Sequence, residues 1–152
     1  MSRSIIIDAN MLLLLVVGST HASYIGKHKR LKDVFTEDEF NMLIDLIKEH
    51  ENLVVTPNIL TETSNLIGHI SEPALSAIRQ QLAYLIQLSQ EEYVESRKAC
   101  RELSFIKLGL TDASLLDYLK NNKTSTLLTV DLDLAIRAEI NELNVINFNH
   151  LR

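Results

Sequence analysis

A short apolar strand that stops at an acidic residue opens the chain, and it most constrains the fold. Residues 5–7 are three consecutive isoleucines, and Asp8 follows them directly. A short, wholly apolar strand of this kind is typical of a parallel sheet covered by helices on both faces. Residues 11–17 are then apolar without interruption, which predicts a helix buried on nearly all sides.

The rest of the chain alternates between strand and helix patterns. Apolar runs predict further strands at 53–55, 125–130 and 145–146, with a short one at 93–94. Helical spacing predicts helices at about 9–17, 36–50, 57–67, 73–89, 96–104, 112–121 and 132–142. Strands separated by helices indicate an α/β fold with a mainly parallel sheet. The length of 152 residues suits one domain spanning 1–152.

Four acidic residues fall where the chain leaves a predicted strand or runs into a helix. Asp8 and Asp131 end two strands, and Asp112 opens a helix. Glu62 lies in the second turn of the helix that follows the strand at 53–55. Ligands of open α/β sheets bind outside the carboxyl ends of the strands, so the four acids can converge on one edge of the sheet.

Clustered carboxylates predict a divalent metal ion. Like charges raise one another's pKa, and a bound cation removes that cost. An oxygen-only ligand set suits Mg²⁺ or Mn²⁺, and no Cys or His cluster points to zinc. Such a metal can activate water toward a phosphodiester and offset charge on the phosphoryl oxygens.

Each acid also has an ordinary structural explanation. Asp112 and Asp131 are both good helix N-caps, and Glu62 alone would be a solvated helix residue. Asp8 is harder to explain in this way, because a carboxylate between an apolar strand and an apolar helix is costly without a partner or a metal. The inference therefore depends on the set of four rather than on one member.

The order of these acids resembles the PIN-domain nucleases, a family that includes ribonuclease toxins of bacterial toxin–antitoxin pairs. The matching segments are Ile-Ile-Ile-Asp-Ala-Asn at 5–10, Thr-Glu at 61–62, Leu-Thr-Asp-Ala at 110–113 and Leu-Thr-Val-Asp-Leu-Asp-Leu-Ala at 128–135. The likeness covers nearly the whole chain. It implies a three-layer α/β/α fold and an endoribonuclease that hydrolyses RNA with Mg²⁺ or Mn²⁺.

The resemblance also implies roles for particular residues. The implied catalytic metal site consists of Asp8, Glu62, Asp112 and Asp131, with Asp133 as a further acid and with Asn10 and Thr129 as supporting residues that hold carboxylates or water. The connection at 18–35 is long and places Glu62 far from Asp8 in the sequence. The acids at 37–39 are alternatives to Glu62, although they look more like first-turn helix residues.

A basic segment gives the only concentrated positive charge in a chain whose formal net charge is −5. Lys27, Lys29 and Arg30 can hold RNA phosphates beside the acidic site, and a solvated loop is an equal alternative. Tyr24 can stack on a base or pack in an ordinary way. The acidic balance argues against binding by charge alone, but less against a nuclease whose metal reverses the local field.

Other functions remain as alternatives. A catalytically inactive PIN-like binding or scaffold module would keep the fold without the metal. A haloacid-dehalogenase-like phosphatase would need a second aspartate at position 10, which is Asn10, and a receiver domain would need paired acids there. The resemblance implies an RNA substrate and allows a cognate antitoxin or a homodimer as partner.

The sequence also predicts where the protein works. The apolar run at 11–17 is too short to span a bilayer and lacks the features of a signal peptide, so we expect no membrane association. Cys100 is the only cysteine and cannot form an intrachain disulfide, which suits the cytoplasm. We expect Cys100 to be a small buried apolar residue.

Overall fold

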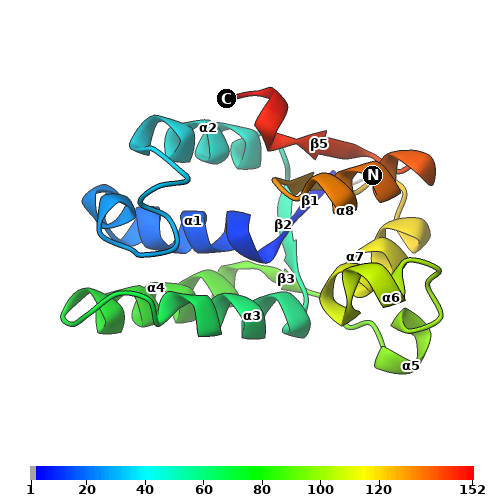
Figure 1. Cartoon of the computed structure of the whole chain (residues 1–152), viewed down its shortest axis with the longest axis horizontal. Helices are drawn as coiled ribbons and strands as arrows, with labels where there is room; N and C mark the ends of the chain where they lie inside the picture. Colours follow the sequence, from blue (N-terminus) through cyan, green and yellow to red (C-terminus); the bar gives the residue numbers. More distant parts are fainter. Residues whose placement is uncertain (1–2) are drawn as a thin grey trace.

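The computed structural model describes residues 3–152 and contains a five-stranded sheet in the order β3-β2-β1-β4-β5 (Figure 1). The strands are β1 (Ser4–Ile7), β2 (Asn52–Val55), β3 (Gln90–Glu91), β4 (Thr126–Thr129) and β5 (Val145–Asn147). Every pairing in this sheet is parallel, and Ile6 in the central strand pairs with Val54 on one side and Leu127 on the other. The prediction of an α/β fold with a parallel sheet is confirmed.

Helices cover both faces of this sheet. The chain passes from β1 to β2 and β3 through α1 (Ala9–Thr20), α2 (Glu37–Lys48), α3 (Pro57–Ile67) and α4 (Ala74–Leu88), and it returns to β4 and β5 through α5 (Ser96–Ala99), α6 (Phe105–Leu108), α7 (Leu110–Asn121) and α8 (Leu132–Ile140). Figure 1 shows the two groups of helices on opposite sides of the sheet. The three-layer α/β/α arrangement is therefore confirmed.

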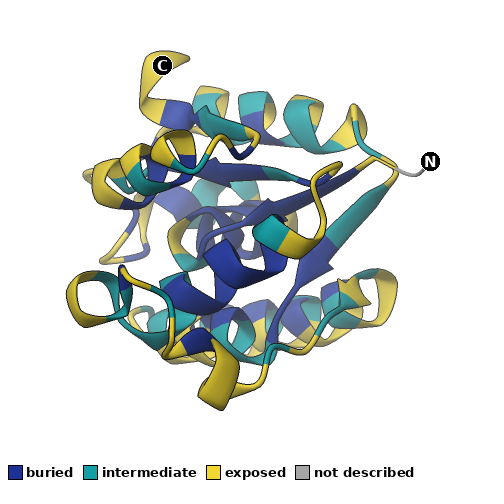
Figure 2. Ribbon diagram, turned by 90° about the vertical axis from the view of Figure 1, so that its right-hand side faces the viewer, coloured by how far each residue is buried: buried dark blue, intermediate teal, exposed yellow. Residues whose placement is uncertain are grey.

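The α1 helix is the centre of one layer. All residues from Met11 to Gly18 are buried, as predicted from the apolar run, and α1 packs against α2, α3 and α4. Figure 2 shows the buried strands surrounded by helices whose outer sides are exposed. Within residues 3–152, no helix combines the length and the apolar character that crossing a membrane requires.

Three local predictions differ from the structure. The third strand lies at Gln90–Glu91 rather than at 93–94, because it is a two-residue edge strand held by pairing with Val54 and Val55 rather than by β-propensity. The predicted helix at 96–104 ends at Ala99, its one buried residue, and a separate helix follows it. Cys100 caps that short helix at its C-terminal end and is exposed, so the prediction that it is buried was wrong.

The connection between α1 and α2 is more ordered than its polar sequence suggested. It contains the 3₁₀ helix η1 (Ala22–Gly26) followed by turns. Ile25, His28 and Leu31 are at most 1% exposed. The segment is therefore ordered around these three buried side chains, whereas Lys27, Lys29 and Arg30 are exposed, and the choice between RNA-binding and merely solvated cations stays a prediction.

Candidate metal centre

The strand order creates a crevice beside β1 at the carboxyl ends of the strands. The chain leaves β1 toward β2 and later enters β4 on the other side of β1, so the helices that follow β1 and β4 lie on opposite faces. Such a topological switch point is where open α/β sheets bind ligands. Asp8 directly follows β1 and Asp131 lies two residues beyond β4, so both acids flank this crevice.

Asp8 is buried and held from three directions. One carboxylate oxygen, Oδ1, accepts a hydrogen bond of 2.8 Å from the Met11 N–H and thereby caps α1. The other, Oδ2, accepts hydrogen bonds from the Thr129 hydroxyl and, at 3.2 Å, from the Val130 N–H. Burial raises the pKa of Asp8, while these three hydrogen bonds act in the opposite direction. The carboxylate is therefore fixed in position and costly to ionise without a cation.

Thr129 connects the two acids that flank the crevice. Its hydroxyl donates to Asp8 and accepts a hydrogen bond of 2.9 Å from the Asp131 N–H. Asp131 in turn caps α8, where its Oδ1 accepts a bond of 3.1 Å from the Leu134 N–H. The capping role that the sequence allowed for Asp131 is thus present. It leaves the second carboxylate oxygen of Asp131 available to the pocket.

Asp112 enters the same site from α7. Gly109 is the N-cap of this helix, and Asp112 lies in its first turn without a capping bond, so the capping alternative was wrong for Asp112. Burial raises its pKa to about 7, and the negative charges of Asp131, Asp8 and Glu62 add to the rise. The carboxylates from four separate elements are therefore close enough to repel one another.

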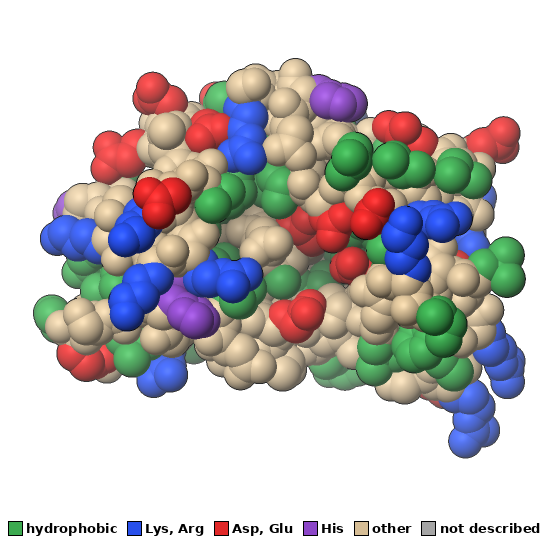
Figure 3. Space-filling view, viewed as in Figure 1, with side chains coloured by type: hydrophobic (Ala, Val, Ile, Leu, Met, Phe, Trp, Pro, Cys, Tyr) green, Lys and Arg blue, Asp and Glu red, His purple; other side chains and the backbone are tan. Residues whose placement is uncertain are grey.

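A pocket of about 380 Å³ lies between these acids. Its lining includes Asp8, Asn10, Arg30, Glu62, Asn65, Asp112 and Asp131. Figure 3 shows acidic side chains gathered in a hollow of the surface with basic side chains beside it. The structure therefore brings together all four acids that the sequence singled out, together with Asn10.

The alternatives to Glu62 lie elsewhere. Residues 37–39 form the first turn of α2. Glu39 completes the capping box with Thr36 and forms an ion pair of 3.2 Å with Arg152. These acids are not among the residues that line the pocket, whereas Glu62 is. The long connection between α1 and α2 lengthens the sequence between Asp8 and Glu62 without separating them in space.

Asp133 is not brought into the pocket. It lies two residues beyond the helix cap and points to a different side of α8, where its carboxylate is 3.7 Å from the Lys107 ammonium. Its side chain is 56% exposed. The helix geometry thus separates two acids that the sequence places in one turn.

Sequence reasoning missed one polar residue of the pocket. Asn65 lines it beside Glu62, and the signal was present because residues three apart on a helix share a face. The basic residue that enters the pocket is Arg30 rather than a lysine, and no sequence signal distinguished it from Lys27 and Lys29.

The ligand atoms of the pocket are of the type that a hard divalent cation prefers, but the carboxylates lie too far apart to hold one as they stand. Carboxylate and amide oxygens are the ligands that Mg²⁺ and Mn²⁺ prefer. In their present positions, no three His, Cys, Asp or Glu side chains within residues 3–152 are arranged so that they could hold a metal ion. Within that range no side-chain hydrogen bond or ion pair engages Glu62 or Asp112, so a cation would not have to displace such a partner from either carboxylate.

Comparison with known proteins does not assign this chain to a family. No protein-family model matches it, and no curated protein matches it.

Proposed function

We propose that this protein is a metal-dependent endoribonuclease whose metal site consists of Asp8, Glu62, Asp112 and Asp131. One observation carries the proposal: carboxylates from four elements face one pocket at the switch point of a parallel sheet. The rise of the Asp112 pKa to about 7 reflects burial and the repulsion that a bound cation would relieve. Stability alone does not explain four acids gathered in this way.

The residues divide into anchored and free ligands. Asp8 and Asp131 are held by Thr129 and by helix N–H groups, so they offer oxygens at fixed positions. Glu62 and Asp112 complete the set from α3 and α7. A bound Mg²⁺ or Mn²⁺ would supply Lewis-acid stabilisation of the phosphoryl oxygens and would lower the pKa of an attacking water.

Two further side chains act on the substrate rather than on the metal. Arg30 carries the positive charge among the described residues that line the pocket, and its guanidinium can offset charge that develops on the scissile phosphate. Asn10 is exposed at the pocket, where its amide can orient a water or a phosphate oxygen. This arrangement requires no Ser, Cys or His nucleophile.

RNA is the substrate we propose, because the resemblance implies it and because Arg30, Lys27 and Lys29 all project from the segment beside the acidic pocket. A cognate antitoxin, a homodimer and a cytoplasmic location are implied by the resemblance or by composition, and they stay predictions.

The decisive experiment measures cleavage of total RNA. We expect the wild type to cleave in Mn²⁺, to lose activity in a chelator, and to lose activity in the Asp8→Asn variant. Asp133→Asn is the matched control, because that exposed aspartate lies outside the pocket, and it should cleave like the wild type. Cleavage that persists in the chelator or in Asp8→Asn would refute the proposal.

A catalytically inactive scaffold is the second candidate, and the open spacing of the acids favours it. Calorimetric titration with Mn²⁺ separates the two candidates. A nuclease should bind Mn²⁺ with a heat that Asp112→Asn weakens or removes. A scaffold should show no heat that depends on these carboxylates.

A further inference from the structure

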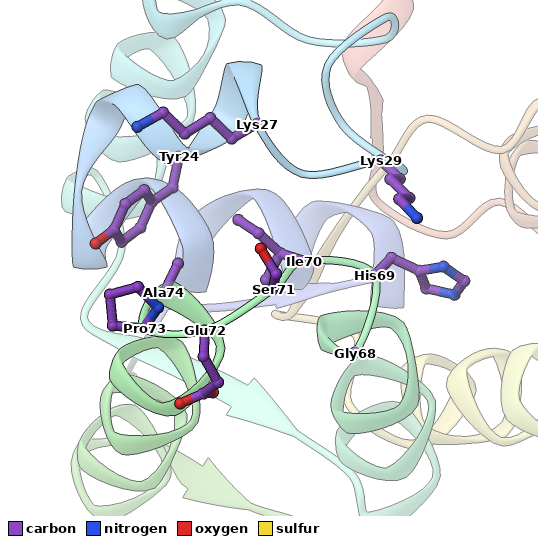
Figure 4. Close-up of a pocket in the computed structure, with 10 residues that line it drawn as sticks. All are labelled: Tyr24, Lys27, Lys29, Gly68, His69, Ile70, Ser71, Glu72, Pro73 and Ala74. Carbon is purple, nitrogen blue, oxygen red and sulfur yellow. The ribbon is translucent and has the colours of Figure 1, made fainter.

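A second cavity lies beside the acidic pocket. It has a volume of about 670 Å³ and is formed by η1, the basic segment and the connection from α3 to α4 (Figure 4). Tyr24, Lys27, Lys29, His69 and Glu72 are the aromatic, basic and acidic side chains among its lining residues. The metal site does not use this cavity.

The two cavities adjoin along two segments of the chain. Lys29 lines the second cavity and its neighbour Arg30 lines the acidic pocket. In the same way, Gly68 lines the second cavity and Leu66, at the end of α3, lines the acidic pocket. A ligand too long for the acidic pocket can therefore continue past Arg30 into the second cavity.

Hydrogen bonds hold the basic segment against α3. The imidazole of the buried His28 lies 3.0 Å from the Leu66 carbonyl oxygen through Nε2, and its Nδ1 accepts a bond of 3.1 Å from the Arg30 N–H. The Lys29 N–H donates to the His69 carbonyl oxygen at 3.1 Å. The side chains of Lys29 and Arg30 therefore project from a backbone that is fixed relative to Glu62.

The second cavity places cationic and aromatic groups along its length. Figure 4 shows Lys29 and His69 at one end and Tyr24 with Lys27 at the other. The Lys27 ammonium lies 5.8 Å from the centre of the Tyr24 ring. Glu72 is the acidic side chain in the lining, and its two carboxylate oxygens already accept hydrogen bonds of 2.8 and 2.6 Å from Ser76. Two lysines against one carboxylate leave the lining net positive, and Tyr24 and His69 supply its aromatic surface.

We infer that one continuous single-stranded polynucleotide occupies both cavities, with phosphates beside Arg30, Lys29 and Lys27 and a base against Tyr24 or His69. Spaced cations and aromatic rings are the combination by which proteins hold single strands. The position of the scissile phosphate rests on the proposed function, whereas the path of the strand rests on the second cavity. The path implies that cleavage requires unpaired nucleotides on one side of the cut.

Binding without cleavage tests this path. A fluorescein-labelled oligouridylate is titrated with the intact protein in a chelator, and anisotropy is followed from about 0.05 to 0.2 M salt. Each phosphate contact to a single strand contributes about 0.7 to the salt slope, so the double variant Lys27→Ala/Lys29→Ala should reduce the slope by about 1.4. At 0.1 M salt this corresponds to binding about 25-fold weaker if only counterion release is lost.

Lys32→Ala is the matched control, because Lys32 is exposed on the same segment but lines neither cavity. Its affinity and salt slope should fall less than those of the double variant. Equal effects of the two changes, or no binding by the wild type, would overturn the inference. Oligothymidylate in a parallel titration distinguishes an RNA path from one that also accepts DNA.

The outcome is separable from that of the proposed function. Metal-dependent cleavage with an unchanged double variant would keep the nuclease and reject the path. Strand binding that depends on Lys27 and Lys29, without metal-dependent cleavage, would keep the path and reject the nuclease.

Discussion

Replacing Asp112 by asparagine should stabilise the protein in the absence of metal while weakening its response to metal. The Asp112 carboxyl is mostly buried, and burial is the main cause of its raised pKa. The negative charges of three neighbouring acids raise the pKa further. Asparagine keeps the shape and removes the charge. This substitution therefore tests whether the acids repel one another in the folded state.

The size of the effect follows from the two pKa values. The folded-state pKa of about 7 exceeds the ordinary value of 3.8 by about 3 units, equivalent to about 4 kcal/mol at 1.36 kcal/mol per unit. Because Asp112 is partly exposed, we take about 2 kcal/mol as the expected gain of Asp112→Asn at pH 8. The sign is set by proton binding: the folded state binds this proton more tightly, so stability falls as pH rises from about 4 to 7.

Urea unfolding in a chelator at pH 5.5 and pH 8 measures this gain. Asp112→Asn should be the more stable protein at pH 8, with a smaller advantage at pH 5.5. Addition of Mn²⁺ should raise the midpoint of the wild type much more than that of the variant. Asp133→Asn is again the control, since its carboxylate is exposed and outside the pocket.

Equal stability of Asp112→Asn and the wild type at pH 8 would refute the electrostatic reasoning. So would a gain that does not change between the two pH values, because repulsion by ionised neighbours has to depend on ionisation.

Three further predictions concern the surroundings of the site. Thr129→Val removes the hydroxyl that bonds to Asp8 and should lower the free energy of unfolding by about 1–3 kcal/mol, measured with urea. Gly18→Ala should cost about 1–3 kcal/mol in the same assay, because the new Cβ would overlap the Phe40 ring. Gly26→Ala is its control and should be neutral, because a Cβ there meets nothing within 4 Å. Burial lowers the pKa of His28 below its ordinary value of 6.5, so the stability that neutral His28 contributes is present above pH 6.5 and is lost as the pH falls. The free energy of unfolding in urea should therefore decrease less between pH 7 and pH 5 for His28→Gln than for the wild type.

Much of the fold could be predicted because its central elements carry their own signals. The isoleucines of β1 and the apolar run of α1 can be accommodated only where both faces are covered. Thr36 with Glu39, and Thr56 with Pro57, fixed two helix starts through local hydrogen bonding and backbone restriction. The edge strand β3 carried no such signal, since its position depends on pairing with β2.

The site was partly predictable for the same kind of reason. Asp8 and Asp131 follow strands, so topology alone places them at one edge of the sheet. Asp133 lies two residues beyond Asp131 at the start of α8, and residues two apart on a helix do not share a face, so its exclusion from the pocket was predictable from the helix start. Arg30 reaches the pocket because His28 holds its backbone against α3, a tertiary contact between residues 38 positions apart.

The bond between Asp8 and Thr129 spans 121 positions of the chain, which has a consequence for biosynthesis. During synthesis Asp8 is made long before β4, α8 and the Thr129 hydroxyl that holds its carboxylate. On the proposed function, the metal site therefore stays incomplete, and the nuclease inert beside the RNA-rich ribosome, for as long as the segment through α8 has not been made.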